Sequence, residues 1–242
     1  MTKENFIESK EKETEYFLEK ISELLNAGKE FLDNEYVKQF GQLSKMFNII
    51  RGSAQIIANK KFERFLKGFN NGKPTDVQIK KLANYIDDEK KAEYISDTFS
   101  KVLLSNSSKA CLLMGSLLHD IVENKTNLSY QDLNCLSALV SFFDYDIDNY
   151  KWIFDNFSYR SNISESTIRM RARKQKMEYM SIMLTVEKSV THHLLIKRFE
   201  ADSDASSNGE DIDVESEIDE YYVITDIGKK IMSYISRVSK AS

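Results

Sequence analysis

The sequence predicts a mainly α-helical protein with a small antiparallel β-hairpin near its C-terminus. One proline and eight glycines in 242 residues leave few positions that would interrupt a helix. Apolar residues recur at helical spacing over most of the chain, and capping residues precede many of these stretches. Two strand-like runs, at residues 194–199 and 221–224, lie between two helical patterns. The hydrophobic content of 41% is enough for a folded core.

The N-terminal half is expected to form a series of helices. Capping residues fix where several of them begin: Thr75 or Asp76, then Asp87 and Asp88, then Ser107 or Ser108. The expected helices cover residues 3–32, 34–58, 60–69, 77–86, 91–104 and 109–123. The last of these is apolar on most sides, which predicts that it is the central helix of its domain. Gly115 within it would let a neighbouring helix approach closely.

The C-terminal half is expected to alternate helices with loops and two strands. Ser129 and Ser164 are the predicted N-caps of helices over residues 130–143 and 165–180. Residues 144–148 and 158–164 are expected to be non-helical. The remaining expected elements are helices at 150–157 and 181–193, strands at 194–199 and 221–224, and a helix at 227–235 that Thr225 or Asp226 caps.

Charge is unevenly distributed along the chain, whose net charge is −4. Nine acidic residues and no basic residue lie between Asp202 and Glu220, so the rest of the chain is mildly basic. The segment 201–220 is therefore expected to be a flexible acidic loop. Asymmetry of this kind is compatible with nucleic-acid contact without requiring it.

The densest basic cluster lies in the helix predicted over residues 165–180. Three interpretations stay open for it: contact with phosphates, pairing with the acidic loop, or an ordinary solvated helix. The following helix would be the recognition helix of a DNA-binding domain, and it offers Thr185, Lys188, Ser189, Thr191, His192 and His193. The candidate nucleic-acid-binding residues are Arg169, Arg171, Arg173, Lys174, Lys176, Lys188, Thr191 and His192.

The order helix, strand, acidic loop, strand, helix at the end of the chain resembles a winged helix. The run Tyr-Val-Ile-Thr-Asp-Ile-Gly-Lys-Lys-Ile at residues 222–231 is similar to the second wing strand and final helix of many bacterial winged-helix proteins. The resemblance implies a helical domain over residues 1–125 and a winged-helix-like domain over 128–242, with 201–220 as the flexible wing loop. Winged helices serve both DNA binding and protein contacts.

Residues 61–150 resemble a helical domain of bacterial proteins encoded among prophage and phage-defence genes. The runs that carry this resemblance are KFERFLKGF at 61–69, EKKAEYIS at 89–96 and LSYQDLNCLSAL at 128–139. These runs are packing patterns, and the resemblance implies no catalytic residues. It implies a bacterial or phage origin and a role in phage defence.

No pattern in the chain predicts an enzyme. His119 and Asp120 form an isolated pair without further ligands at metal-binding spacing, so we expect no metal site and no cofactor. Cys111 and Cys135 lie in apolar helical patterns and are expected to be buried thiols in a reducing cytoplasm. No apolar stretch is long enough for a transmembrane helix, and the first residues do not resemble a signal peptide.

These observations lead to two functional hypotheses. The first is a non-enzymatic cytoplasmic DNA-binding or regulatory protein acting in phage defence. The alternative is a protein–protein interaction subunit of a larger complex that uses the winged helix as a docking module. Both allow DNA or a protein as partner, exclude the membrane, and are compatible with a homo-oligomer.

Overall fold

The structure, a computed structural model, describes residues 16–25, 53–70, 75–160, 162–208 and 211–241. The chain divides into two compact units. The first unit comprises Met1–Asp144 and Tyr234–Ser242, and the second unit comprises Tyr145–Ser233. The sequence had indicated a boundary near residues 125–128, whereas this division lies after Asp144 and returns the end of the chain to the first unit.

The helices described in the first unit include α3 (Ser53–Asn70), α4 (Asp76–Tyr85), α5 (Glu89–Leu104), α6 (Ser108–Asn124) and α7 (Tyr130–Ser141). The last four of these begin where the capping residues predict. Asp88 and Ser107 accept hydrogen bonds from backbone N–H groups three residues on, at 2.8 and 2.9 Å. Residues 16–25 are also helical. The helix α3 joins the end of the helix expected over 34–58 to the one expected over 60–69. The rest of the helices expected over 3–32 and 34–58 lies outside the described residues.

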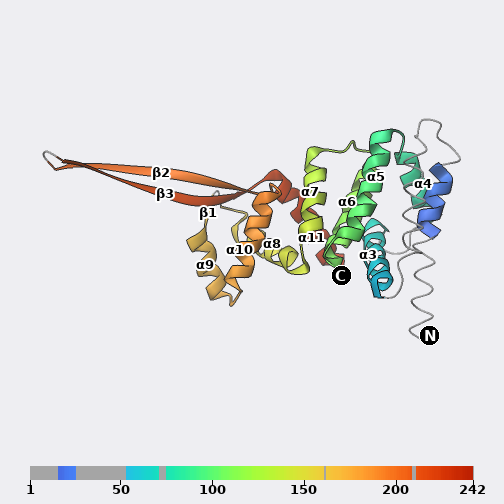
Figure 1. Ribbon diagram of the computed structural model, residues 1–242, viewed down its shortest axis with the longest axis horizontal. Coiled ribbons are helices and arrows are strands. Elements are labelled where there is room, and N and C mark those ends of the chain that lie inside the picture. Colours follow the sequence, from blue (N-terminus) through green and yellow to red (C-terminus); the bar gives the residue numbers. More distant parts are fainter. Residues whose placement is uncertain (1–15, 26–52, 71–74, 161, 209–210, 242) are drawn as a thin grey trace. The chain divides into compact units, whose positions relative to one another are not determined.

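The predicted central position of α6 is confirmed. It contacts α3, α4, α5 and α7 (Figure 1). Its side chains from Ala110 to Leu118 are buried, as are Ile121 and Val122. A helix that is apolar on most sides is stable only when other elements bury most of its surface. The four neighbouring helices do this for α6.

The helices α3 and α6 cross at two glycines. A β-carbon at Gly115 would lie 2.0 Å from the carbonyl oxygen of Phe65, and one at Gly68 would lie 1.9 Å from that of Leu112. Both distances are far shorter than any van der Waals contact, so each glycine admits the backbone of the other helix. The close approach expected at Gly115 is thus confirmed, and Gly68 is its counterpart.

Beside this crossing, aromatic rings fill the core of the first unit. Phe99 on α5 packs against Phe17, Phe62 and Phe65, with ring centroids 5.6 to 5.8 Å apart. All four rings are fully buried. Such tilted and edge-to-face pairs add to the free energy gained from burying the rings.

The second unit combines helices with a small sheet. Its elements are α8 (Asp144–Phe157), β1 (Ile163–Ser164), α9 (Glu165–Lys174), α10 (Tyr179–Thr191), β2 (Leu195–Asn208) and β3 (Asp211–Ile224). The helix α11 (Asp226–Ala241) follows, with its first residues in the second unit and its last in the first. The Thr225 hydroxyl accepts a hydrogen bond from the Gly228 N–H at 3.0 Å, as expected for an N-cap.

The sheet is antiparallel, with strand order β1-β3-β2. Ile163 on β1 pairs with Tyr222 on β3, and Leu195 on β2 pairs with Ile224. Ile163, Leu195 and Tyr222 are buried. The sequence had predicted the hairpin but not the short third strand β1, which lies within the loop expected at 158–164.

Three other expectations for this half of the chain differ from the structure. Residues 144–148 begin α8 rather than breaking the helix, which is favourable because acidic residues in a first turn interact well with the helix dipole. The helix expected over 165–180 ends at Lys174, and Lys176 adopts a positive φ of 55° before α10 begins. The segment 201–220 is not a loop, because β2 and β3 stay paired from Leu195↔Ile224 to Asn208↔Asp211 (Figure 1).

Replacing Gly115 with alanine should destabilise the first unit by about 2 kcal/mol or more, because the added methyl group forces α3 and α6 apart. Urea unfolding followed by far-UV circular dichroism measures the change. Asn124→Ala, at an exposed position of the same helix, should change stability by less than about 0.5 kcal/mol. Equal unfolding midpoints for the two variants would contradict the close crossing.

Candidate functional site

The predicted basic residues lie on α9, on α10 and in the turn between them, and the two helices pack against each other in the second unit (Figure 1). Ser164 caps α9 by accepting a hydrogen bond from the Thr167 N–H at 3.3 Å. Ile168 and Ala172 are the buried residues of α9, so most of its other side chains face solvent. The basic side chains nevertheless differ in what they contact.

Arg169 is engaged in contacts within the unit. Its guanidinium pairs with Glu165 at 2.9 Å and lies 4.7 Å from the centre of the Tyr179 ring. The Tyr179 hydroxyl also donates to Glu165. Hydrogen bonds from Tyr179 and Arg169 together lower the pKa of the Glu165 carboxyl, so it is ionised at neutral pH. This cluster joins the start of α9 to the start of α10.

Arg171 is also held by neighbouring side chains. It donates to the Asn156 amide oxygen at 3.3 Å and to the Tyr159 hydroxyl at 3.4 Å. Its guanidinium lies 5.7 Å from the centre of the Phe157 ring. Arg171 therefore attaches α9 to the end of α8, and it is only partly available to a ligand.

Arg173, Lys174 and Lys176 differ from these two arginines. All three are exposed, at the end of α9 and in the turn that follows it. None of them forms an ion pair with another side chain that the structure describes. They are the part of the predicted basic cluster that remains available to a ligand.

Lys188 on α10 points toward α8 rather than toward solvent. Its ammonium lies 2.5 Å from the carboxylate of Asp146, a residue only 5% exposed. The Thr185 hydroxyl donates to the other Asp146 oxygen at 2.8 Å. Asn149 on α8 donates in turn to Thr185 and Ser181, at 3.1 and 2.9 Å. These contacts form the α8–α10 polar network, and they give Lys188 and Thr185 a structural role.

The other predicted residues of α10 lie either on its buried side or at its C-terminal end. Ser189 is fully buried and donates to the Thr185 carbonyl oxygen. Thr191 is exposed, and its hydroxyl donates to the Glu187 carbonyl oxygen at 3.0 Å. His192 ends the helix and is half-buried, and burial lowers its imidazole pKa. Of the residues predicted for groove contacts, only Thr191 lies both within α10 and on its solvent side.

The side of α10 that faces solvent is largely apolar. Its exposed residues follow one another at a spacing of four, three and four positions, which places them on one stripe of the helix. Met180 is 63% exposed and Leu184 is 61% exposed. The outward face of α10 comprises Met180, Leu184, Glu187 and Thr191, flanked by the partly exposed Met183 and Val190.

Sequence reasoning missed the outward face of α10. Apolar residues at helical spacing are expected to face the core, but Leu184 faces solvent. The structure instead buries Ile182, Val186 and the polar residues Thr185 and Ser189. The apolar residues of α10 occupy both sides of the helix, so periodicity alone could not show which side faces inward.

The described residues contain no group of three or more His, Cys, Asp or Glu side chains that could hold a metal ion. His119 on α6 packs edge-on against the Phe69 ring, with centroids 6.0 Å apart. Asp120 forms a bidentate ion pair with Arg237, at 2.6 and 2.9 Å. Cys111 and Cys135 are buried and form no disulfide bond. His119 and Asp120 therefore have packing and ion-pairing roles in the first unit.

Comparisons with known proteins add no assignment. Neither a scan against protein-family models nor searches of curated proteins and of solved structures gave a significant match. Among the helices within the described residues, none has both the length and the apolar character required to cross a membrane.

Replacing Lys188 with methionine should destabilise the second unit by about 1–3 kcal/mol, because Asp146 would keep a largely buried charge without its ion pair. Trp152, the one tryptophan of the chain, lies on α8, so its fluorescence in a urea titration reports the change. Lys174→Met removes an unpaired lysine and should have an effect below about 0.5 kcal/mol. Similar losses in both variants would show that the α8–α10 polar network does not stabilise the unit.

Proposed function

We propose that the second unit is a winged-helix module and that the protein is a non-enzymatic regulator which docks a protein partner through the outward face of α10. The order α8, β1, α9, α10, β2, β3 supports the first part, as does the strand order β1-β3-β2. In this arrangement α9 and α10 are the helix-turn-helix pair, and α10 takes the place of the recognition helix.

The composition of the outward face of α10 is the observation that favours a protein partner. Recognition helices read bases in the major groove chiefly with Arg, Lys, Asn and Gln side chains. The outward face of α10 has none of these, and its one charged side chain is the acidic Glu187. Lys188, the single base within α10, is engaged by Asp146. An apolar face with an acidic residue suits an amphipathic protein segment better than it suits DNA.

The acidic hairpin supports the same proposal. The paired strands β2 and β3 include eight of the nine acidic residues from Asp202 to Glu220, and this segment contains no basic residue. Negative charge of this density repels a phosphate backbone. We therefore favour a protein partner for the winged-helix module. The proposed cellular setting, phage defence in the bacterial cytoplasm, rests on the resemblance of residues 61–150.

DNA binding is the second candidate function, and one observation favours it. Arg173, Lys174 and Lys176 are exposed and unpaired among the described side chains, and they lie at the end of α9 and in the turn before α10. In a helix-turn-helix pair this turn lies close to the DNA. Contacts from these three cations would bind phosphates independently of sequence.

The docking proposal is tested by placing a photo-crosslinking amino acid at position 180 or 184 in cells. Both positions should capture the same protein, and position 77 on α4, whose Val77 is 63% exposed, should not. The purified partner should bind Leu184→Glu at least about tenfold more weakly, because a charge would be buried in an apolar contact. Val77→Glu should bind it as the wild type does. Unchanged affinity of Leu184→Glu would contradict the proposal.

DNA binding is tested by fluorescence anisotropy of a labelled duplex at low and moderate salt. We expect no binding at moderate salt. If DNA binding is the function, the duplex binds in a salt-sensitive manner, and replacing Arg173, Lys174 and Lys176 with glutamine weakens it. Each lost phosphate contact would reduce the slope of log K against log salt by about 0.9. Leu184→Gln serves as the neutral control, since it changes no charge.

A further inference from the structure

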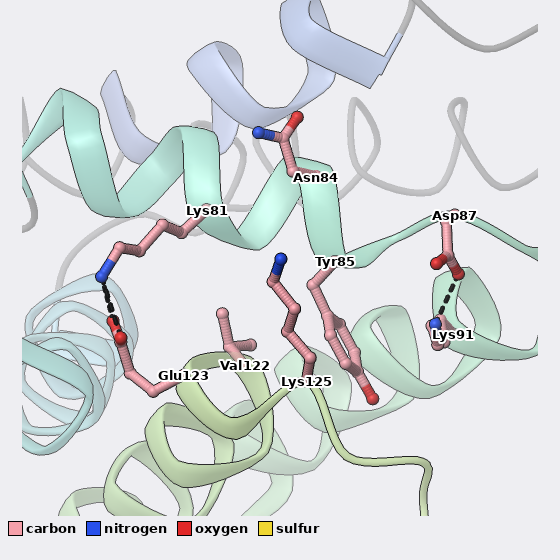
Figure 2. A pocket seen from close by; sticks show the side chains of 8 residues that line it. All are labelled: Lys81, Asn84, Tyr85, Asp87, Lys91, Val122, Glu123 and Lys125. Carbon is pink, nitrogen blue, oxygen red and sulfur yellow. Dashed lines mark hydrogen bonds and ion pairs between the residues drawn. The ribbon is translucent and has the colours of Figure 1, made fainter.

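A hollow of about 400 Å³ lies in the first unit, between the end of α4, the start of α5 and the end of α6. Three lysines line it, one from each of these places: Lys81, Lys91 and Lys125 (Figure 2). Two carboxylates, those of Asp87 and Glu123, line it as well. The charged groups of the hollow thus include one more cation than anion.

Two of the three lysines form ion pairs with the carboxylates of the hollow. Lys81 contacts both oxygens of Glu123, at 2.7 and 2.8 Å, and Lys91 lies 2.5 Å from Asp87. The Lys81–Glu123 pair is well exposed on both sides. Exposed ion pairs contribute little to stability, so a multivalent anion can replace Glu123 as the partner of Lys81.

Lys125 is the remaining cation. It ends α6 in the left-handed conformation, with a φ of 50°, and its side chain extends toward α4 beside Tyr85 (Figure 2). It forms no ion pair with any other described side chain. Its backbone N–H and that of Thr126 bond to the carbonyl oxygens of Val122 and Ile121. These last carbonyls of α6 are therefore satisfied and do not compete for the ammonium group.

The remaining wall of the hollow is neutral. Tyr85 is buried, and its hydroxyl donates to the Thr126 carbonyl oxygen at 3.0 Å. Burial raises the pKa of this hydroxyl to about 12, so it carries no charge at neutral pH. Asn84 also borders the hollow, but its amide points away from the other lining side chains (Figure 2). A ligand would thus meet ammonium groups and an aromatic ring.

We propose that this hollow binds a small phosphate-bearing anion, held by the ammonium groups of Lys125 and Lys81. Phosphate oxygens accept strong charge-assisted hydrogen bonds, and lysine serves as a point charge for them. The hollow is larger than a phosphate group and falls in the size range of small-molecule sites, so the anion can carry a sugar or nucleoside. In the bound state Glu123 gives up Lys81 and turns to solvent.

Isothermal titration calorimetry of the full chain tests this proposal with pyrophosphate, ATP and adenosine in a phosphate-free buffer of low ionic strength. Pyrophosphate and ATP should bind, whereas adenosine should not. Equal affinities for pyrophosphate and ATP would show that the phosphates alone are recognised. Tighter binding of ATP than of pyrophosphate would show that the nucleoside also contacts the hollow. Absence of binding by both phosphate compounds at millimolar concentration would overturn the proposal.

Three variants assign the binding to this hollow. Lys125→Asn should bind about tenfold more weakly, because it removes the ammonium group while asparagine still adopts the left-handed conformation. Glu123→Gln should bind more tightly, because it removes the competing carboxylate from Lys81. Lys80→Gln, on α4 next to Lys81 but outside the hollow, should bind as the wild type does. If Lys125→Asn and Lys80→Gln weakened binding equally, the anion would be held by non-specific attraction to positive charge, and the proposal would be overturned. Thermal melting of each variant verifies its fold.

Discussion

The carboxylate of Asp146 sets the orientation of α10. An ionised group that is almost excluded from solvent must be paired and hydrogen-bonded, and α10 supplies both the ammonium of Lys188 and the hydroxyl of Thr185. Because these two residues must face α8, the opposite side of the helix faces solvent. That side carries Met180 and Leu184. One buried acidic residue thus decides which chemistry the candidate recognition helix offers to a partner.

The first unit depends on a different constraint, the close crossing of α3 and α6. Gly68 and Gly115 each admit the backbone of the opposite helix, and this brings the phenylalanines of α3 within reach of the aromatic core. The arrangement leaves the ends of α4 and α6 side by side with the start of α5. The lysines and carboxylates at these helix ends therefore line one hollow (Figure 2).

Local signals in the sequence predicted much of the fold and little of the site. Ser107, Ser129 and Ser164 each marked the start of a helix, because a cap is formed within four residues of chain. The charge of segment 201–220 predicts a flexible loop, whereas its alternation of apolar and polar residues is typical of a strand. Ile212, Val214, Ile218 and Tyr222 stand at alternating spacing among the acids, which is a strand signal. The basic cluster was found, but its division into engaged arginines and unpaired cations was not.

The helical class, the central α6, the hairpin and the basic cluster can all be predicted from the sequence, because each depends on residues near one another in the chain. Only the tertiary structure decided that Lys188 pairs with Asp146, 42 residues away, and that Leu184 faces solvent. It also brought Lys81 and Glu123 together with Lys125. Contacts between residues distant in the chain leave no periodic trace in it. They follow from how the helices pack, and in this protein they determine which side chains remain available to bind.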